Sequence, residues 1–463
     1  MSDTFDIIIL GSGPGGYVAA LRAAQLGLTV ACVEKNEQLG GTCLNVGCIP
    51  SKTLLYSSEM FYRMSHEGKT LGIIGSDLTY DWVAMQKRRA DVVSGFNQGI
   101  AALFKKGRIQ RFLGVGDLIS PTEVRIDGKQ ILQSKAIILA TGSEPISLPF
   151  LPFDEKKVLS STAALILASP PKKMVVIGAG VIGVELGSVY QRLGTEVQFI
   201  EFLDRICPTF DEAITKQLQQ ILSAQGLTFQ LSSKVTSAEI TDQGVSLHFE
   251  SVKGGKGEIA ADCVLVAIGR RPYTQGLGLA NVGIQVSSKG FIPVDGGFRT
   301  SVPSVYAIGD LIDGPMLAHK ASEEGVAVAE IIAGKCPVID YMALPSVIYT
   351  SPEVAAVGFT EAEAKQHGLE VAVGTFSFKA NSRARCSNED QGFVKVIADK
   401  QSDRLLGVHI LGFHASELIS GCAIALEQRM TSGELANCPF AHPTLAEAVK
   451  EAALAVHKRA LHQ

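Results

Sequence analysis

Residues 5–34 read FDIIILGSGPGGYVAALRAAQLGLTVACVE. The apolar run before the first glycine predicts a buried parallel strand. Gly11, Gly13 and Gly16 form a G-x-G-x-x-G motif that leads into a predicted helix, and a second strand then ends at Glu34. In such a unit the helix N-terminus binds a pyrophosphate and the acid binds a ribose hydroxyl. The stretch therefore predicts a dinucleotide-binding α/β domain.

The same pattern occurs a second time further along the chain. Gly178, Gly180 and Gly183 follow another apolar run, and Glu201 lies 23 residues after Gly178, as Glu34 does after Gly11. This internal repeat predicts a second dinucleotide site. A carboxylate at position 201 accepts a hydrogen bond from a free ribose 2′-hydroxyl and repels a 2′-phosphate, so we expect NAD rather than NADP.

Two closely spaced cysteines follow the first of these units. Residues 40–52 read GGTCLNVGCIPSK, with Cys43 and Cys48 separated by four residues just before a predicted helix. Pro50 suits the first turn of that helix, whose N-terminus favours a thiolate. The pair can cycle between dithiol and disulfide. Two unpaired structural cysteines are the alternative interpretation.

A histidine and a glutamate near the end of the chain form another candidate pair. His442 comes just before Thr444, which we expect to cap a helix, and Glu447 follows Thr444 at the spacing of a capping box. Glu447 can also orient His442 and stabilise its charged form, as an acid does in an acid–base pair. The two functions are compatible.

Composition indicates a large protein with several domains. The chain has 463 residues, a formal net charge of −4 and nine cysteines. It is too long for one core, and its basic residues are scattered, so we expect neither a nucleic-acid partner nor a disulfide scaffold. The first strand begins at Phe5 and no long uncharged apolar stretch occurs, so we expect no signal peptide, no membrane segment and a cytoplasmic location. A processed organellar protein would begin in the same way.

Seven segments together resemble the class I flavin-dependent pyridine nucleotide–disulfide oxidoreductases, specifically the branch that oxidises dihydrolipoamide. They are the first glycine motif with Glu34, Cys43–Cys48, Ala140–Ser143, the second glycine motif with Glu201, Ala267–Pro272, Tyr306–Asp310 and Ala441–Glu447. The similarity covers essentially the whole chain.

The resemblance implies an α/β fold with two doubly wound, Rossmann-like dinucleotide-binding domains and a C-terminal α+β dimerisation domain. Loops that contain Pro and Gly suggest the domain boundaries. Near residue 342 the pattern changes to a series of predicted strands followed by helices, which suggests another boundary. We expect an FAD-binding domain over 1–148, an NAD-binding domain over 149–272, a segment over 273–341 that completes the FAD domain, and the dimerisation domain over 342–463.

The resemblance also assigns cofactor contacts. For FAD these are Gly11, Gly13, Gly16, Glu34, Lys52, Gly116, Thr141, Gly142, Ser143, Asp310, Met316, Leu317, Ala318 and His319. For NAD they are Gly178, Gly180, Gly183, Glu201 and Gly269. Lys52 lies one helical turn after Cys48, and the resemblance implies that it sits near the flavin and pairs with Glu185.

The implied reaction is oxidation of protein-bound dihydrolipoamide. Cys43 would be the sulfur that exchanges with substrate, and Cys48 the sulfur that contacts the flavin. His442, supplied by the partner subunit of a homodimer with shared active sites and held by Glu447, would be the base. FAD would pass the electrons on as hydride to NAD. The implied partners are lipoyl-bearing protein domains of 2-oxoacid dehydrogenase or glycine-cleavage complexes.

Other functions were weighed against this one. Glutathione-reductase-like enzymes use NADPH and would have basic residues near Glu201. Transhydrogenase-like flavoproteins often lack the cysteine pair, and mercuric reductase would have adjacent cysteines near the C-terminus. From another class, Cys43, Cys48, Cys438 and His442 could form a metal site in a binding module, but the two dinucleotide units would then be unexplained. We expect no metal.

Overall fold

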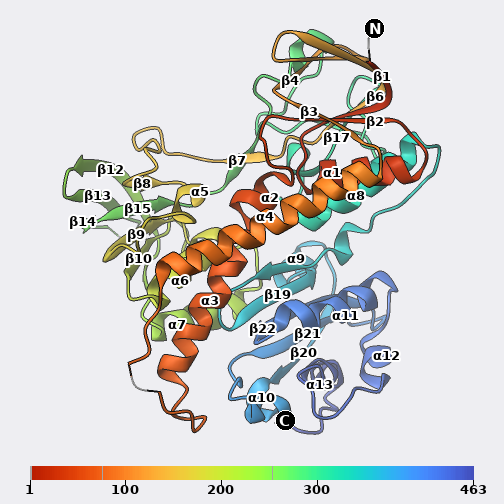
Figure 1. Ribbon diagram of the computed structural model, residues 1–463. Helices are drawn as coiled ribbons and strands as arrows, with labels where there is room; N and C mark the ends of the chain where they lie inside the picture. The colour runs from red at the N-terminus through yellow and green to blue at the C-terminus, as the bar shows by residue number, and fades with distance from the viewer. Residues whose placement is uncertain (1–2, 76, 253) are drawn as a thin grey trace. The chain divides into compact units, whose positions relative to one another are not determined.

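The computed structural model describes residues 3–75, 77–252 and 254–463 (Figure 1). Its chain divides into two compact units. Unit 1 comprises residues up to 53 together with 83–146 and 269–339, and unit 2 comprises 54–82, 147–268 and 340–463. The sequence predicted four segments, which is a finer division than these two units. The boundaries of the four segments remain a prediction.

Unit 1 is built on a seven-stranded sheet in the order β3-β2-β1-β6-β5-β4, with β17 also paired to β6. β1, β2, β3, β6 and β17 are joined by parallel pairings, and β4 and β5 extend the sheet antiparallel. Ile7, Ile8 and Ile9 of β1 are fully buried, which is why this strand is continuously apolar. The strands are β1 (Asp3–Leu10), β2 (Val30–Glu34), β3 (Gln110–Leu113), β4 (Gly116–Ser120), β5 (Glu123–Ile126), β6 (Gln130–Leu139) and β17 (Val305–Ala307).

Two helices pack side by side in this unit, α1 (Pro14–Gln25) and α8 (Ala318–Ile332) (Figure 1). A Cβ added at Gly325 would lie 2.4 Å from the carbonyl oxygen of Gly15, so glycine is required for this close approach. The other elements are α2 (Gly41–Val46), the start of α3 (Cys48–His66), most of α4 (Trp82–Lys106), the pair β7 (Ser143–Pro145) and β16 (Arg270–Pro272), and the short helices η1 (Leu279–Val282) and η2 (Gly309–Leu311).

Unit 2 contains the second dinucleotide-type sheet. Its five strands are all parallel, in the order β11-β10-β9-β15-β8, and a separate antiparallel sheet has the order β12-β13-β14. The strands are β8 (Val158–Leu159), β9 (Lys173–Ile177), β10 (Glu196–Ile200), β11 (Thr228–Gln230), β12 (Ser233–Thr241), β13 (Gly244–Ser251), β14 (Lys256–Ala261) and β15 (Cys263–Val266). The helices are α5 (Ser161–Ala164), α6 (Val181–Arg192) and α7 (Glu212–Ala224).

The C-terminal part of unit 2 is an antiparallel sheet in the order β18-β19-β22-β21-β20. Helix α11 packs on β19 and β22, and α13 packs on β20 and β21 (Figure 1). The strands are β18 (Ser346–Ile348), β19 (Glu353–Gly358), β20 (Val371–Ser377), β21 (Phe393–Asp399) and β22 (Leu405–Gly412). The helices are α9 (Glu361–Gln366), α10 (Ser382–Cys386), α11 (Ala415–Glu427), α12 (Ser432–Asn437) and α13 (Glu447–Val456), with the short helices η3 (Tyr341–Ala343) and η4 (Phe378–Ala380).

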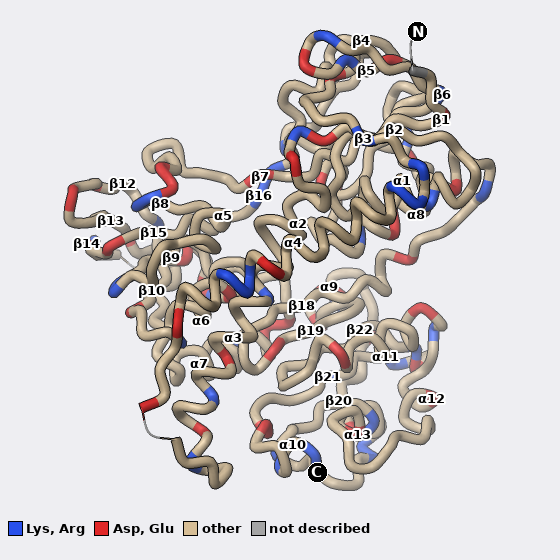
Figure 2. Tube along the Cα trace, in the orientation of Figure 1, with Lys and Arg blue, Asp and Glu red and all other residues tan. Residues whose placement is uncertain are grey.

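These sheets confirm the predicted fold class of two parallel, dinucleotide-type sheets and an α+β C-terminal part. Within the described part of the chain, no helix combines the length and the apolar stretch needed to cross a bilayer. Basic and acidic residues are scattered along the chain between long uncharged stretches (Figure 2).

A buried lysine ties two parts of unit 2 together. Lys395 on β21 donates to both carboxylate oxygens of Asp211, at 3.0 and 2.9 Å, and to Glu361 at 2.8 Å. Asp211 is also the N-cap of α7. Burial alone would raise the pKa of Asp211, but the hydrogen bond and charge of Lys395 outweigh burial, so the net pKa is lowered.

We expect Lys395→Met to destabilise the protein by about 3–5 kcal/mol, because Asp211 would be left as an unpaired buried carboxylate. Urea unfolding at pH 7 measures the difference. Because the folded pKa of Asp211 is lowered, this stabilisation is present above the ordinary value of 3.8 and is lost as pH falls through the folded value. Lys400→Met, which breaks an exposed pair with Glu370, is the control. Equal unfolding free energies for the two variants would contradict this account.

Candidate active site

The first glycine loop is shaped by close contacts that only glycine permits. Gly11 has φ +98°, and a Cβ there would lie 2.5 Å from the carbonyl oxygen of Ala140. A Cβ at Gly16 would lie 1.9 Å from the Gly11 carbonyl oxygen. Gly13 is the N-cap of α1, and a Cβ there would approach only Gly41, at 4.0 Å. The loop is therefore held against the end of β6, and the helix terminus faces space that a bound group can fill.

The second glycine loop has the same geometry. Gly178 has φ +96°, and a Cβ there would lie 2.6 Å from the carbonyl oxygen of Ala267. A Cβ at Gly183 would lie 2.3 Å from the Gly178 carbonyl oxygen. Gly180 is the N-cap of α6, and a Cβ there would meet nothing within 4 Å. The internal repeat of the sequence is thus a repeat of backbone conformation, with the same open helix terminus.

The two acids that close the units have a structural function that the sequence did not suggest. The Glu34 carboxylate accepts hydrogen bonds from the backbone N–H groups of Ser12 at 2.9 Å and Asn36 at 3.0 Å. The Glu201 carboxylate accepts from the N–H of Ala179 at 2.6 Å and from that of Leu203 at 2.8 Å. Each acid therefore fastens its glycine loop to the end of the neighbouring strand. Ribose binding by these acids remains a prediction.

Among the predicted flavin residues of unit 1, Ser143 and Asp310 are in direct contact. The Ser143 hydroxyl donates to Asp310 at 2.5 Å, and Thr141 donates to the carbonyl of Tyr273 at 2.8 Å. Gly142 has φ +72° with nothing within 4 Å of an added Cβ. A Cβ at Gly116 would lie 2.8 Å from a methyl group of Leu10. Gly142 is therefore open while Ser143 is fixed on Asp310, and the contacts of these residues with FAD remain a prediction.

Arg270 also belongs to this cluster, although the sequence did not single it out. Its Nε donates to the Ser143 hydroxyl oxygen at 2.8 Å, and its Nη2 donates to the Ser143 carbonyl at 2.7 Å. Burial lowers the pKa of Arg270, and the charges of Asp310 and Cys48 oppose that shift. The sequence offered one clue to Arg270: it directly follows Gly269 within the Ala267–Pro272 segment. Gly269 has φ +125°.

A fully buried ion pair supports the turn that carries Asp310. Met316 and Leu317 lead into α8, whose first residues are Ala318 and His319. The next residue, Lys320, pairs with Glu324 one turn later at 2.9 Å. Glu324 accepts from the N–H of Gly309 at 2.7 Å, and Lys320 donates to the Gly309 carbonyl at 3.2 Å. Both backbone groups next to Asp310 are therefore held from α8.

The two cysteines lie on separate helices. Cys43 is in α2 and Cys48 is the first residue of α3, so the prediction that both precede a helix was wrong, because a short helix forms between Gly40 and Gly47. A hydrogen bond with Cys48 and burial raise the pKa of the Cys43 thiol, and the charge of Lys52 acts in the opposite direction. The two cysteine side chains are therefore within hydrogen-bonding reach of each other, and their contact disfavours the Cys43 thiolate.

Lys52 and Glu185 belong to different units. Lys52 lies on α3, one turn after Cys48, as predicted. Glu185 on α6 is 3% exposed and accepts from the N–H of Tyr349 at 2.9 Å, so it is a buried carboxylate rather than a surface one. Their pairing remains a prediction.

His442 and Glu447 are in direct contact. The Nδ1 of His442 lies 3.0 Å from Oε1 of Glu447, which leaves Nε2 to accept a proton. Burial raises the pKa of Glu447, but hydrogen bonds from the Thr444 N–H and from His442 outweigh burial and lower it. The His442 side chain is 69% exposed. The pair has the arrangement of a general base held by a carboxylate.

The capping-box prediction for Thr444 was wrong. Helix α13 begins at Glu447, and the Thr444 hydroxyl donates to the carbonyl of Ala441 at 2.8 Å instead of capping the helix. Only the acidic half of the motif forms, since Glu447 Oε2 accepts from the Thr444 N–H at 2.8 Å. Glu447 therefore fixes the loop that carries His442 as well as the ring itself.

Sequence profiles identify the family of this protein. Residues 5–325 match the profile described as pyridine nucleotide-disulphide oxidoreductase, and residues 344–453 match the dimerisation domain of the same group. The chain belongs to this oxidoreductase family. The match confirms the family and fold class expected from the seven sequence segments. FAD and NAD are accordingly its cofactors, and the C-terminal part of unit 2 is a dimerisation domain.

Several curated relatives of the family match over nearly the full chain. A mitochondrial dihydrolipoyl dehydrogenase of Pisum sativum is 48% identical, covering 100% of this chain and 93% of the relative. A dihydrolipoyl dehydrogenase of Trypanosoma brucei brucei is 47% identical, covering 99% and 98%. A leghemoglobin reductase of Vigna unguiculata is 49% identical, covering 99% and 88%.

Solved structures of two family members are similar in fold. LpdA from Mycobacterium tuberculosis is 27% identical with a TM-score of 0.89, over 97% of this chain and 99% of that one. The HOCl-induced flavoprotein disulfide reductase RclA from Escherichia coli is 26% identical with a TM-score of 0.86, also over 97% and 99%. Both are similar over all parts of this chain.

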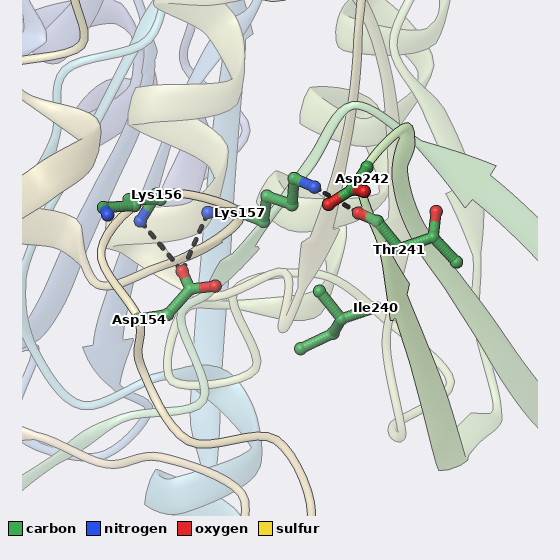
Figure 3. A pocket seen from close by; sticks show the side chains of 6 residues that line it. All are labelled: Asp154, Lys156, Lys157, Ile240, Thr241 and Asp242. Atoms are coloured by element: carbon green, nitrogen blue, oxygen red, sulfur yellow. Dashed lines mark hydrogen bonds between the residues drawn. The ribbon is translucent and has the colours of Figure 1, made fainter.

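A shallow hollow elsewhere in unit 2 shows no comparable chemistry. It is lined by Asp154, Lys156, Lys157, Ile240, Thr241 and Asp242 (Figure 3). The Asp154 carboxylate accepts hydrogen bonds from three backbone N–H groups, each at 2.8 Å. The Lys157 ammonium donates to the Thr241 carbonyl. These charged groups hold two loops together. Across the described ranges, no group of three or more His, Cys, Asp or Glu side chains is arranged to hold a metal ion.

Proposed function

We propose that this chain is a dihydrolipoyl dehydrogenase, which oxidises protein-bound dihydrolipoamide to lipoamide with NAD as the final electron acceptor. The observation that carries the proposal is the contact between Cys43 and Cys48 on two consecutive helices, the first of which begins at Gly41 against Gly13 of the first glycine loop. Dihydrolipoyl dehydrogenases that are 47–48% identical over almost the whole chain support the same substrate.

The proposed reaction begins with Cys43 and Cys48 joined as a disulfide. A substrate thiolate attacks Cys43, the Cys43–Cys48 bond breaks, and Cys48 leaves as a thiolate. The second substrate sulfur then attacks the first, which releases Cys43 and closes the substrate disulfide. The substrate has lost two electrons and two protons, and the enzyme disulfide has gained the two electrons. FAD held by the first glycine loop would supply the two-electron relay from this dithiol to NAD.

The residues that hold the cofactors fit those groups. Gly11, Gly13 and Gly16 shape an open helix terminus for the FAD pyrophosphate, and Asp310 borders the same space through Ser143. In the same way, Gly178, Gly180 and Gly183 shape an open helix terminus for the NAD pyrophosphate. Arg270 places a partly buried positive charge within electrostatic range of Cys48, where it favours the thiolate.

His442 is the proposed base for the substrate thiol. Its Nε2 takes the proton, and the Glu447 carboxylate on Nδ1 stabilises the resulting imidazolium. In the proposed homodimer the active sites are shared, and His442 acts on the cysteines of the partner. The proposed partners are lipoyl-bearing domains of a 2-oxoacid dehydrogenase or glycine-cleavage complex, and the proposed location is the cytoplasm or an organellar matrix.

A steady-state assay with free dihydrolipoamide tests the proposal. We expect the enzyme to reduce NAD as it oxidises dihydrolipoamide. We expect no reaction with glutathione. A purified flavoprotein that reduces glutathione disulfide with NADPH, and leaves dihydrolipoamide unchanged, would instead assign the chain to a glutathione-reductase-like function.

Glu201 is expected to set the choice between NAD and NADP. We expect the wild type to prefer NAD by at least ~100-fold in kcat/KM, because a 2′-phosphate beside this carboxylate would cost on the order of 3 kcal/mol. Glu201→Arg should weaken NAD use and improve NADP use. Glu201→Gln removes the charge but keeps only one oxygen for the Ala179 and Leu203 N–H groups, so it should reduce the NAD preference and also loosen the glycine loop. Comparable wild-type kcat/KM values for the two nucleotides would show that Glu201 does not discriminate.

A further inference from the structure

Asn45 lies between the two cysteines in sequence and organises the loop that carries them. It is on α2, two residues after Cys43 and three before Cys48. Its Nδ2 donates to the carbonyl of Leu39 and to that of Gly41, both at 3.0 Å. One amide therefore ties α2 to the chain segment that enters it.

Asn97 on α4 fixes the direction of the Asn45 amide. Its Nδ2 donates to Oδ1 of Asn45 at 3.0 Å and to the carbonyl of Val93, one turn back on its own helix, at 2.9 Å. The second bond holds the Asn97 side chain against α4. Because the Asn45 oxygen is engaged by Asn97, the Asn45 nitrogen must face the two loop carbonyls.

The Asn97 oxygen shows that this residue is not optimal for packing alone. Oδ1 of Asn97 is buried, and within the described part of the chain it has no hydrogen-bond partner. Such an atom loses its hydration without replacement, so an apolar side chain of similar size would be more favourable for packing. The donors of Asn97, rather than its fit in the core, account for an asparagine at this position.

The segment held by Asn45 is also anchored on its other side. Gly40 and Gly41 have φ +97° and +58°, and a Cβ at Gly41 would lie 2.5 Å from the Cα of Gly13 in the first glycine loop. Leu39–Gly41 is therefore held between the glycine loop and the Asn45–Asn97 pair. The start of α2, and with it Cys43, is fixed relative to the fold from two directions.

We propose that Asn97 is a positioning residue for the redox pair: through Asn45 it holds Cys43 against Cys48 and so sets how readily the disulfide closes. This rests on the proposed function of the two cysteines. Closing the disulfide removes two electrons and two protons from the thiols, and here the oxidant is the bound FAD or an external disulfide. A less restrained Cys43 has a lower effective concentration at Cys48, so the disulfide becomes easier to reduce.

The test uses the FAD-loaded enzyme and the variants Asn97→Leu and Asn97→Ala. Each is equilibrated with mixtures of oxidised and reduced dithiothreitol, and Cys43 and Cys48 are quantified by alkylation and mass spectrometry. We expect the equilibrium constant for disulfide formation to fall at least tenfold, which is about 30 mV for a two-electron couple. In the reduced enzyme, iodoacetamide should modify Cys43 several times faster. Gln98→Ala changes the adjacent, exposed residue of α4 and should match the wild type.

Asn97→Leu separates positioning from stability, because removal of the unpartnered oxygen offsets the lost hydrogen bond to Asn45, and its unfolding midpoint should stay close to that of the wild type. A shifted thiol equilibrium in that stable variant supports the proposal. An equilibrium within twofold of wild type in both Asn97 variants would overturn it. If the wild type itself forms no Cys43–Cys48 disulfide in oxidised dithiothreitol, the proposed function fails, which is a different result.

Discussion

Replacing either Cys43 or Cys48 by Ser is expected to reduce dihydrolipoamide oxidation to background, while the two variants differ in colour. Cys43→Ser leaves Cys48 as a thiolate beside oxidised FAD and should show a long-wavelength charge-transfer absorption band at rest. Cys48→Ser removes that thiolate and should lack the band. The structure supports this division, because Cys48 begins helix α3, whose N-terminus favours a thiolate, whereas the hydrogen bond with Cys48 and burial raise the pKa of the Cys43 thiol.

We would compare the long-wavelength absorbance of the two purified variants. The reference is the wild type titrated anaerobically with one equivalent of dithiol. The exposed Cys336 is the control, since Cys336→Ser should leave both activity and spectrum unchanged. Equal bands in Cys43→Ser and Cys48→Ser would mean that the assignment of the exchanging and flavin-contacting sulfurs is wrong.

His442→Gln is expected to lower turnover of dihydrolipoamide by roughly 10²–10⁴, the usual contribution of a general base. Oxidation of NADH by an artificial acceptor does not use the dithiol and should remain close to wild type. Glu447→Gln should show a weaker form of the same pattern, because Glu447 orients the ring without transferring the proton. His462→Gln is a matched control, since this imidazole also pairs with a glutamate of α13, Glu451, at 2.8 Å.

Mixed dimers test whether His442 acts across the dimer. Combining a Cys43→Ser chain with a His442→Gln chain should restore one working site per heterodimer, since each parent retains what the other lacks. Stopped assays on purified heterodimers measure the recovery. Inactive heterodimers from two folded, flavin-loaded parents would place the base and the cysteines on the same chain.

Local sequence patterns predicted the elements whose form depends on near neighbours. The second copy of the glycine pattern predicts a strand next to Glu201, and β10 ends one residue before it, at Ile200. The sequence pattern was less reliable at helix ends. The N-cap of α13 is Ala446 instead of the expected Thr444, because the Thr444 hydroxyl donates to the Ala441 carbonyl, a competing local partner that spacing alone does not exclude.

Residues that act through distant partners were not predictable in this way. Arg270 reaches Ser143, 127 positions earlier in the chain, and Asn97 reaches Asn45, 52 positions earlier. Neither Arg nor Asn carries a sequence signal that distinguishes a buried, directed side chain from a solvated one. The second function of Glu201, as the acceptor that fastens its own glycine loop, was hidden for the same reason.

The sequence by itself determined the two glycine loops, the cysteine pair and the His442–Glu447 spacing, because backbone geometry converts short separations in the chain into fixed separations in space. Only the tertiary structure decided which groups hold these residues in place. Contacts such as those of Asn97 with Asn45 and of Glu324 with Gly309 form when separately folded segments pack together. Their hydrogen-bond geometry depends on that packing, which short-range spacing does not encode.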